Sequence, residues 1–276
     1  MGEVKPLKKY DSVLWGEINQ PENFVELMTY ITQNQKPSIN VRYWRGQADI
    51  TWQLTPSIVR KIKLEEYNRN KSGKELDKSI AYWESILLNK AKKNLYNYDD
   101  RGRQLNDIEL LAKLQHYGAA TRLLDFSKNV LIALWFCVSD PQYKDITGLL
   151  LGIDTDIMSG MENEFDFETN YSDFSNEISK SDNICIVDSP AIVPRICSQD
   201  SVFLCSKSVD DKHGTFMLPD SEWYKKVIAI SPGLKSECLT ILSGCFNITP
   251  LTIYPDIEGF ASANSTKWKL SEFTRW

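Results

Sequence analysis

The first half of the chain is organised by apolar residues that recur every three or four positions, a spacing typical of helices with one buried face. In residues 19–35, Phe24, Leu27 and Ile31 fall on one such face. Residues 106–117 end just before Gly118, which suits the position after a helix C-terminus. The expected helices cover residues 19–35, 56–67, 74–96, 106–117, 130–138, 231–242 and 255–263.

Short runs of β-branched and aromatic residues predict the strands. Residues 40–45 are such a run and are closed by Gly46. The other expected strands cover residues 121–126, 147–153, 184–187, 192–197, 202–205, 215–218, 227–230 and 251–254. Because helices dominate before residue 140 and strands after it, the pattern favours an α+β fold with a mixed or antiparallel sheet core.

We expect a single domain over residues 1–276, because no repeat and no low-complexity linker interrupts the chain. Its motif core spans residues 40–263, and residues 57–117 form a helical insertion near the N-terminus. Residues 154–183 are acidic and rich in Asn and Ser. They are expected to form a long loop or partial helix, either a solvated insertion or a lid.

The composition is that of an ordinary globular protein, with 42% hydrophobic and 25% charged residues among 276. It excludes a collagen-like, low-complexity or mostly disordered chain. The net charge is -5 and the isoelectric point is about 5.3. A general phosphate-backbone binder needs a basic footprint, so broad nucleic-acid binding is disfavoured, although a local basic groove is still allowed.

Nothing in the sequence predicts a membrane or a metal. The opening residues contain no apolar signal region, and the longest apolar run, residues 130–138, is far shorter than the roughly 20 residues that span a bilayer. We therefore expect a soluble cytoplasmic protein. The six cysteines form no C-x-x-C pair and have only His116 and His213 as companions, so we expect core cysteines and no metal site.

Three segments carry the candidate chemistry: residues 43–47 (YWRGQ), 114–127 (LQHYGAATRLLDFS) and 194–203 (PRICSQDSVF). In the first, Arg45 presents a fork of donors beside the bare backbone of Gly46, which suits a phosphate, a ribose or a flat amide. The alternative is a structural Arg paired with an acid.

The second segment places polar side chains around a helix–turn–strand–helix junction. Asp125 and Ser127 lie at the exit of the expected strand, next to a helix N-terminus that favours anions. Alternatively, Arg122 forms a buried bridge with Asp125. His116 ends a helix, where a capping or core role competes with a catalytic one.

These segments, in this order, resemble the FRG domain, a family named for an aromatic-Arg-Gly motif. The resemblance rests on Trp44-Arg45-Gly46-Gln47, Leu54-Thr55-Pro56-Ser57 with Arg60, residues 115–127, Ala133-Leu134-Trp135-Phe136, Arg195 with Gln199, and Tyr254-Pro255-Asp256 with Gly259. It spans about residues 24–263. The family occurs in bacteria and mobile elements, often near toxin or phage-defence genes, which implies a bacterial effector with an antitoxin or phage protein as partner.

A weaker resemblance connects the chain to ADP-ribosyltransferases of the Arg–Ser–Glu type. It implies a split sheet and NAD as substrate. The resemblance implies Arg45, Ser127 and the position of Gln199 as catalytic residues. We add Asp125 as a substitute for the missing Glu, and His116 because of its place beside the polar junction in the second segment. Binding of NAD or another nucleotide is expected from Arg45, Gly46, Gln47, Tyr117, Thr121, Arg122 and Ser127.

The resemblance implies separate roles for these residues. Arg45 would grip the NAD diphosphate or ribose, the Gly46 backbone the nicotinamide amide, and Ser127 the nicotinamide ribose or the Arg45 side chain. Gln199 falls where the family has a Glu that stabilises an oxocarbenium-like transition state. Because Gln is uncharged, either Asp125 or Asp200 substitutes, or the chemistry differs, or the nucleotide is bound without reaction.

Three function classes remain open from the sequence. The first is an NAD-using transferase that modifies a protein or nucleic-acid acceptor. The second is a non-catalytic module that senses a nucleotide or protein in a defence system. The third is a hydrolase or nuclease using His116 and Asp125, either alone or with a bound Mg²⁺ or Mn²⁺.

Overall fold

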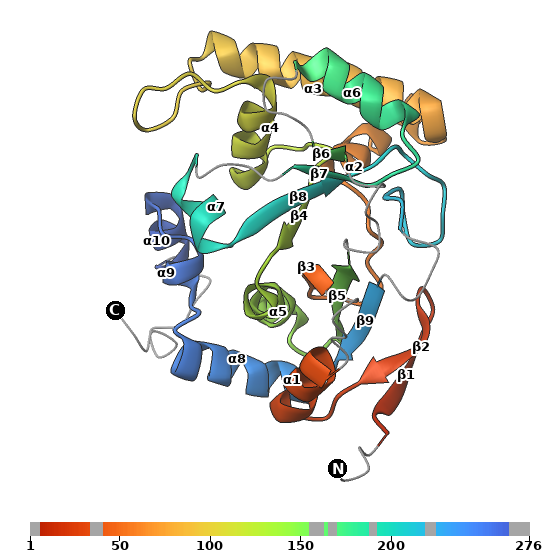
Figure 1. The fold of residues 1–276 in the computed structure, drawn as a ribbon, viewed down its shortest axis with the longest axis vertical. Coiled ribbons are helices and arrows are strands. Elements are labelled where there is room, and N and C mark those ends of the chain that lie inside the picture. Colours follow the sequence, from red (N-terminus) through yellow and green to blue (C-terminus); the bar gives the residue numbers. More distant parts are fainter. Residues whose placement is uncertain are drawn as a thin grey trace.

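The computed structural model describes residues 6–33, 41–154, 163–164, 170–187, 192–218 and 225–264. The described strands form one nine-stranded sheet in the order β1-β2-β9-β5-β3-β4-β8-β7-β6 (Figure 1). The strands are β1 Lys8–Ser12, β2 Gly16–Gln20, β3 Val41–Gln47, β4 Leu124–Ser127, β5 Gly148–Asp154, β6 Asn163–Glu164, β7 Cys185–Val187, β8 Ser201–Cys205 and β9 Lys225–Ile230. The β2/β9 and β6/β7 pairs are parallel and the others antiparallel, so the predicted mixed sheet is confirmed.

Helices surround this sheet (Figure 1). They are α1 Phe24–Gln33, α2 Ser57–Lys63, α3 Gly73–Lys93, α4 Asp107–His116, α5 Val130–Val138, α6 Tyr171–Lys180, α7 Pro194–Ser198, α8 Pro232–Phe246, α9 Pro250–Ile253 and α10 Ile257–Ala263, with the 3-10 turns η1 Glu66–Asn68 and η2 Pro141–Tyr143. Helices α2, α3 and α4 follow one another between β3 and β4, as the predicted helical insertion requires.

Several predicted elements were wrong. Residues 192–197 and 251–254 were expected as strands but lie in helices α7 and α9, because Pro194 and Pro250 occupy first-turn positions where a missing N–H costs nothing. Residues 215–218 form no strand. The chain from Gly16 to Gln20 is a strand, and α1 begins only after Asn23, whose side chain accepts the N–H of Glu26 (2.9 Å).

The hairpin of β1 and β2 was missed because its strands are short and polar. In the acidic segment, α6 supplies the partial helix, and buries Phe174 and Ile178. Residues 155–162 and 165–169 of that segment lie outside the described residues. Among the described helices, none is long and apolar enough to cross a membrane.

Helix α5 packs directly on the central strand β3, and Gly46 makes this approach possible. A Cβ atom at Gly46 would lie 1.9 Å from the carbonyl oxygen of Ala133 in α5. The helix also contacts a buried cluster that includes Leu150 of β5 and Leu234 of α8. The position of α5 over the sheet is therefore set by a residue that cannot carry a side chain.

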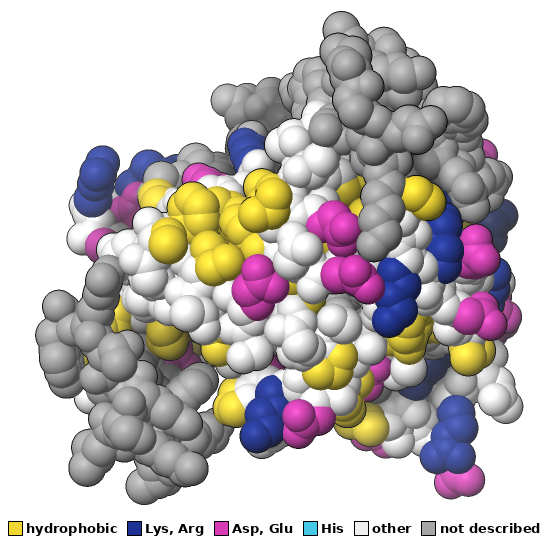
Figure 2. Space-filling model, turned by 90° about the horizontal axis from the view of Figure 1, so that it is seen from below, with side chains coloured by type: hydrophobic (Ala, Val, Ile, Leu, Met, Phe, Trp, Pro, Cys, Tyr) yellow, Lys and Arg dark blue, Asp and Glu magenta, His cyan; other side chains and the backbone are white. Residues whose placement is uncertain are grey.

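The end of the molecule formed by α1 and α8 shows a group of hydrophobic side chains on its surface (Figure 2). Exposed apolar residues of these helices are Val25, Leu239 and Phe246, and the rings of Phe24 and Phe246 are 6.1 Å apart. This group lies on the part of the fold farthest from α3 and α6 (Figure 1).

Candidate functional site

The sheet splits between its two central strands. β3 and β4 share a single ladder pair, Trp44 with Ser127, whereas β3 pairs with β5 along nearly its whole length. Beyond that pair a side chain takes the place of the ladder, because Nη1 of Arg45 donates to the main-chain oxygen of Asp125 (2.6 Å). The ladder between β3 and β4 is therefore interrupted, although both strands belong to the same sheet.

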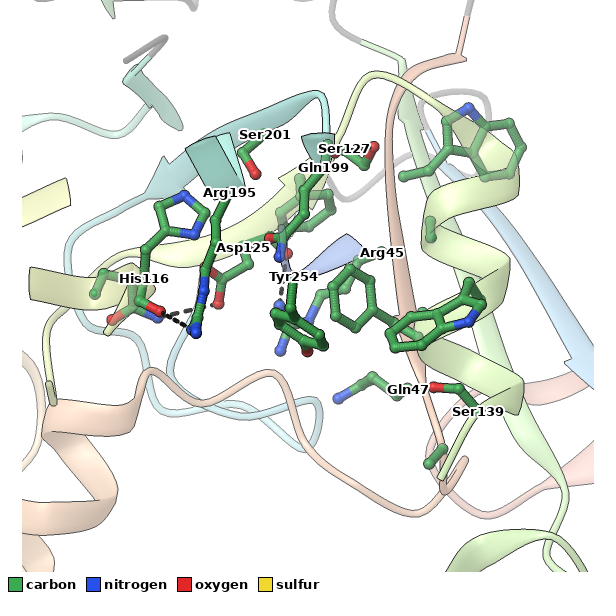
Figure 3. Close-up of a pocket in the computed structure, with 18 of the residues that line it drawn as sticks. Arg45, Gln47, His116, Asp125, Ser127, Ser139, Arg195, Gln199, Ser201 and Tyr254 are labelled. Carbon is green, nitrogen blue, oxygen red and sulfur yellow. Dashed lines mark hydrogen bonds between the residues drawn. The ribbon is translucent and has the colours of Figure 1, made fainter. Parts of the chain in front are cut away.

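A pocket of about 540 Å³ opens at this split (Figure 3). Its volume lies within the roughly 300–1,000 Å³ typical of small-molecule sites. Strands β3 and β4, helices α4, α5 and α7 and the chain after α9 contribute to it. Its aromatic lining consists of Trp44, Trp52, Tyr117, Phe126, Trp135, Phe136 and Tyr254.

Most of the residues singled out in the sequence meet in this pocket. It is lined by Arg45, Gly46, Gln47, His116, Tyr117, Asp125, Ser127 and Gln199. Thr121 and Arg122, which we expected to bind the nucleotide, are not among the lining residues; they are 0% and 3% exposed. Arg45 and Gln199, which are 154 residues apart in the sequence, thus line one pocket, and no spacing argument could establish this.

Arg45 is the cationic group at the split. Its side chain lies 6.0 Å from the centre of the Phe126 ring. Burial lowers its pKa, against the charge of Asp125, and the nearby charge of Arg60 adds to the lowering. Its Nε atom is buried without a hydrogen-bond partner among the described residues. Arg45 therefore binds the backbone of Asp125 through Nη1, and its Nε–H has no acceptor among the described residues.

Asp125 is an exposed carboxylate whose orientation is fixed by two further residues. Thr121 donates from its hydroxyl to Oε1 of Gln115 (2.7 Å), and Nε2 of Gln115 donates to Oδ2 of Asp125 (3.0 Å). Because the Thr121 hydroxyl donates to the amide oxygen of Gln115, the amide nitrogen of Gln115 faces Asp125. Thr121 therefore acts on the pocket indirectly, through the carboxylate it helps to orient.

His116 lies beside Asp125 in the pocket wall (Figure 3). Burial lowers its pKa below the ordinary value of 6.5, only partly opposed by the charge of Asp125. The ring is therefore mainly neutral at pH 7, and its centre lies 5.1 Å from the centre of the Phe203 ring. Its Nε2 atom is buried and has no hydrogen-bond partner among the described residues.

Ser127 and Gln199 are bonded within the fold. The Ser127 hydroxyl donates to the main-chain oxygen of Gln199 (2.8 Å) and accepts the N–H of Asn129 (3.0 Å). The Gln199 amide donates to the carbonyl of Ile253 (3.1 Å). Both residues thus join β4 to α7 and α9 at the edge of the pocket, independently of any role in ligand binding.

Arg195 closes the pocket wall and was missed as a site residue. Its guanidinium forms a two-armed ion pair with Asp256, where Nη2 meets Oδ1 at 2.8 Å, and donates to the His116 carbonyl at 3.1 Å. The group also lies 5.4 and 5.1 Å from the rings of Tyr117 and Tyr254. The signal was present, because the sequence resemblance described above rests in part on Arg195 and Asp256, but their pairing across 61 residues could not be predicted from sequence.

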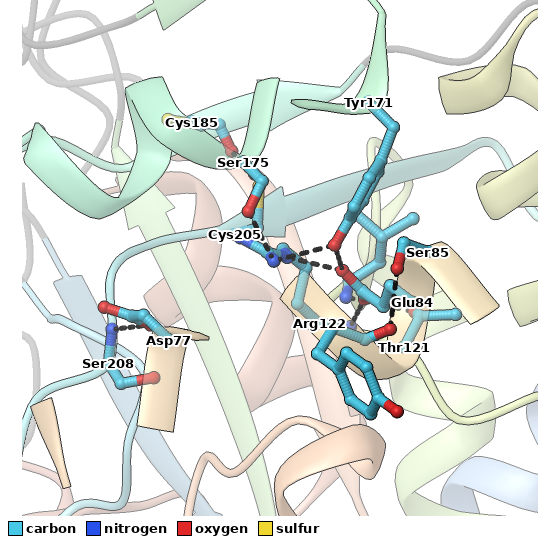
Figure 4. Close-up of polar contacts among 12 residues, drawn as sticks. Asp77, Glu84, Ser85, Thr121, Arg122, Tyr171, Ser175, Cys185, Cys205 and Ser208 are labelled. Carbon is cyan, nitrogen blue, oxygen red and sulfur yellow. Dashed lines mark hydrogen bonds and ion pairs between the residues drawn. The ribbon is translucent and has the colours of Figure 1, made fainter. Parts of the chain in front are cut away.

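Arg122 belongs to a buried network (Figure 4). The expected pairing with Asp125 is wrong. Arg122 instead donates from Nε to Glu84 (2.7 Å) and from Nη2 to Tyr171 and Ser175 (3.0 and 3.1 Å). The sequence could not indicate Glu84, which lies in α3, 38 residues earlier. Arg122 thus ties α3 and α6 to the strand that carries Asp125.

Four of the pocket-lining residues carry a buried polar atom that has no partner among the described residues. These atoms are Nε of Arg45, Oε1 of Gln47, Nε2 of His116 and Nε1 of Trp135. Folded proteins leave few such atoms unsatisfied, and each exception needs an explanation. Their concentration around one pocket is the pattern expected where a polar ligand completes the hydrogen bonding after a small side-chain adjustment.

No group of three or more His, Cys, Asp or Glu side chains in the described ranges is arranged to hold a metal ion. The six cysteines are free thiols, four of them buried. The pocket lining offers two guanidiniums, three carboxylates, one imidazole, serine hydroxyls, amides and aromatic faces.

These features define a mixed α/β protein with a polar and aromatic pocket at a split in its sheet. Residues 40–146 match the family model of the FRG domain. The FRG resemblance is thereby confirmed over β3, the helical insertion, β4 and α5, while the motifs around Arg195 and Tyr254 lie outside the match. Searches of curated proteins and of solved structures returned no significant match.

Proposed function

We propose that the pocket binds NAD and cleaves its nicotinamide–ribose bond, passing ADP-ribose to an acceptor. The observation that carries this proposal is the convergence of Arg45, Asp125 and His116 on one pocket at the split between β3 and β4. A dinucleotide offers two phosphates for a guanidinium and two bases for aromatic walls, and the pocket has both kinds of partner.

In the proposed reaction the bond between ribose C1′ and the nicotinamide nitrogen breaks, and its electron pair leaves with nicotinamide. A positive charge develops on the ribose, and a fixed carboxylate nearby stabilises it. Asp125 is suited to this role because Gln115 and the Arg45 contact hold both its side chain and its backbone. An acceptor hydroxyl or amine then attacks C1′ and gives its proton to the neutral imidazole of His116.

This proposal assigns to Asp125 the charge that Gln199 lacks. The other acid considered, Asp200, does not line the pocket; its carboxylate faces Asn129 (3.4 Å). The Gln199 amide is already bonded to the Ile253 carbonyl. Arg45 would bind a phosphate with the nitrogens that it does not give to Asp125.

A second candidate is a non-catalytic module that senses a nucleotide in the same pocket. It is favoured by Ser127, whose hydroxyl hydrogen is already donated to the Gln199 carbonyl and so cannot be donated to the ribose without breaking that contact. A nucleotide would then be held by Arg45 and the aromatic walls, and its binding would be read by a protein partner.

The test is nicotinamide release from labelled NAD, measured with NAD binding by calorimetry. The transferase predicts release by the wild type, loss of both binding and release in Arg45→Ala, and loss of release with retained binding in Asp125→Asn. Arg101→Ala, which removes an exposed Arg outside the pocket, is the matched control. Binding without release in the wild type would favour the sensor, and neither binding nor release would reject the transferase and a sensor of NAD.

The FRG resemblance suggests the biological setting: a cytoplasmic effector of a bacterial toxin or phage-defence system, with an antitoxin or a phage protein as partner. Induced expression in a bacterial host should then slow growth with the wild type and not with Asp125→Asn. Equal growth of both strains, at equal protein levels, would contradict an NAD-consuming toxin.

A further inference from the structure

The segment from α2 to α3 carries positive charge on an otherwise acidic chain. Residues 57–93 contain ten Lys and Arg against five Asp and Glu, while the whole chain has a net charge of -5. Two of the five carboxylates are withdrawn from the surface, since Asp77 and Glu84 are 5% and 0% exposed. They are bonded to Ser208 and Arg122, while every Lys and Arg of the segment is at least partly exposed.

Aromatic side chains are interleaved with this charge. Tyr67, Tyr82 and Trp83 are 72%, 61% and 38% exposed. Nζ of Lys71 lies 5.6 Å from the centre of the Tyr67 ring and donates to the hydroxyl of Ser79 (3.0 Å). Ser79 precedes Trp83 by one helical turn, and the Tyr82 and Trp83 rings are 5.4 Å apart. Lys71 thus joins the Tyr67 ring to α3 one helical turn before the pair of rings Tyr82 and Trp83.

The outer side of α3 extends this surface. Lys74, Lys78 and Tyr82 follow at intervals of four residues, so they share one side of the helix. We call this surface the basic–aromatic face, consisting of Tyr67, Lys71, Lys74, Lys78, Tyr82 and Trp83.

Acidic groups border the basic–aromatic face. Glu75 lies within the same stretch of α3, and Glu65 and Glu66 precede Tyr67. Asp173 and Glu177 belong to α6, which packs beside α3 through Tyr171 and its bond to Glu84 (Figure 1). The surrounding acids would confine a negatively charged ligand to a narrow track along α3.

We propose that the basic–aromatic face binds single-stranded nucleic acid. Lysines separated by one helical turn suit a phosphate backbone, and exposed rings between them suit unpaired bases, which stack on aromatic faces regardless of sequence. A duplex would offer the phosphates but would keep its bases from Tyr67, Tyr82 and Trp83. The acidic remainder of the chain repels the same ligand, so binding is restricted to this face.

Binding to the face does not depend on the chemistry proposed for the pocket, and it can be tested without NAD.

The experiment measures fluorescence anisotropy of labelled oligothymidylate and oligouridylate of about 20 nucleotides with the full chain, at about 50 and about 200 mM salt. The wild type should bind with a steep salt dependence. The double variant Lys74→Glu, Lys78→Glu should bind at least tenfold more weakly at low salt, and its slope of log K against log salt should fall by about 1.4. Tyr82→Ala should weaken binding about 5- to 150-fold, the measured range for one stacked base.

Lys8→Glu with Lys9→Glu is the matched control, because it makes the same charge change on the exposed strand β1. Its affinity should stay within about twofold of the wild type, as expected for charges outside the bound track. The proposal is overturned if the wild type does not bind, if the control loses as much affinity as the α3 variant, or if a duplex of equal length binds as tightly and Tyr82→Ala changes nothing. Capture by phosphatidylserine vesicles instead of oligonucleotides would also overturn it.

Discussion

Arg122 and Glu84 form an ion pair of 2.7 Å in which both side chains are almost completely withdrawn from solvent, at 3% and 0% exposed. Glu84 also accepts the backbone N–H of Arg122 and the hydroxyl of Tyr171 (2.6 Å). Its charge is thus surrounded by donors, and the pair joins α3 and α6 to the strand leading into Asp125.

Arg122→Met should unfold the protein more easily, because it leaves the Glu84 charge buried without its counter-charge. Breaking a buried pair from one side typically costs about 3–5 kcal/mol. The measurement is the midpoint and slope of urea unfolding. Arg101→Met, which removes an exposed Arg, should change stability by less than about 0.5 kcal/mol. If Arg122→Met changes stability as little as Arg101→Met does, the ion pair with Glu84 does not contribute to stability.

A second prediction concerns Gly46, which is needed for the packing of α5 on β3 whether or not its backbone binds a ligand. Gly46→Ala would bring a methyl group against the Ala133 carbonyl oxygen and the Cys137 nitrogen of α5. Both are backbone atoms, so α5 must move, and we expect a loss of stability at the upper end of the range of about 1–3 kcal/mol for overpacking.

Gly244→Ala provides the control for Gly46→Ala. Gly244 lies in α8, and nothing lies within 4 Å of the position of an added Cβ. Alanine there should stabilise the protein by up to about 1 kcal/mol, since it favours the helix. If thermal unfolding shows equal effects at both glycines, the approach of α5 to β3 is not the reason for Gly46.

The extent to which sequence predicts this protein differs between the fold and the site. The long periodic helices, such as α3 and α8, and the apolar strand β5 follow from local pattern. The strands predicted at α7 and α9 were wrong because Pro194 and Pro250 begin short helices whose apolar residues face the core. Hydrophobicity alone does not separate a buried single turn from a buried strand.

The site residues were recognised by type and motif, but their roles depend on long-range contacts. Arg122 was expected at the nucleotide, but it lies before β4 and its partner Glu84 lies on α3. Thr121 likewise acts through Gln115. The role of Arg195 could be identified only from the structure, in which Asp256 forms an ion pair with it.

His116 gives a prediction that is independent of any activity. Burial should hold the pKa of His116 below 6.5, and the Asp125 charge works against that shift. Removing the charge in Asp125→Asn should therefore lower the pKa of His116 further. Nitrogen NMR titration measures both values, and the only other histidine, His213, is assigned with His213→Gln. A rise of the His116 pKa in Asp125→Asn would contradict their placement beside each other.

Asp256 gives the dependence of stability on pH. Its hydrogen bonds to Arg195 are the main cause that holds its pKa below the ordinary value of 3.8. A carboxylate with a lowered pKa in the folded state stabilises fully above its unfolded pKa, and the contribution disappears as pH falls through the folded value. Wild type should therefore be more stable than Asp256→Asn at pH 7, and the difference should shrink as the pH is lowered below 3.8.

The measurement for Asp256 is urea unfolding of both proteins from neutral to strongly acidic pH. Asp145→Asn, which removes an exposed carboxylate outside the Arg195 contact, is the control and should follow the wild type at each pH. A difference between wild type and Asp256→Asn that stays constant down to the lowest pH would mean that the ionised form of Asp256 is not what Arg195 stabilises. Because Arg195 also holds the His116 carbonyl, the same variant should loosen the pocket wall, seen as faster amide exchange at the end of α4.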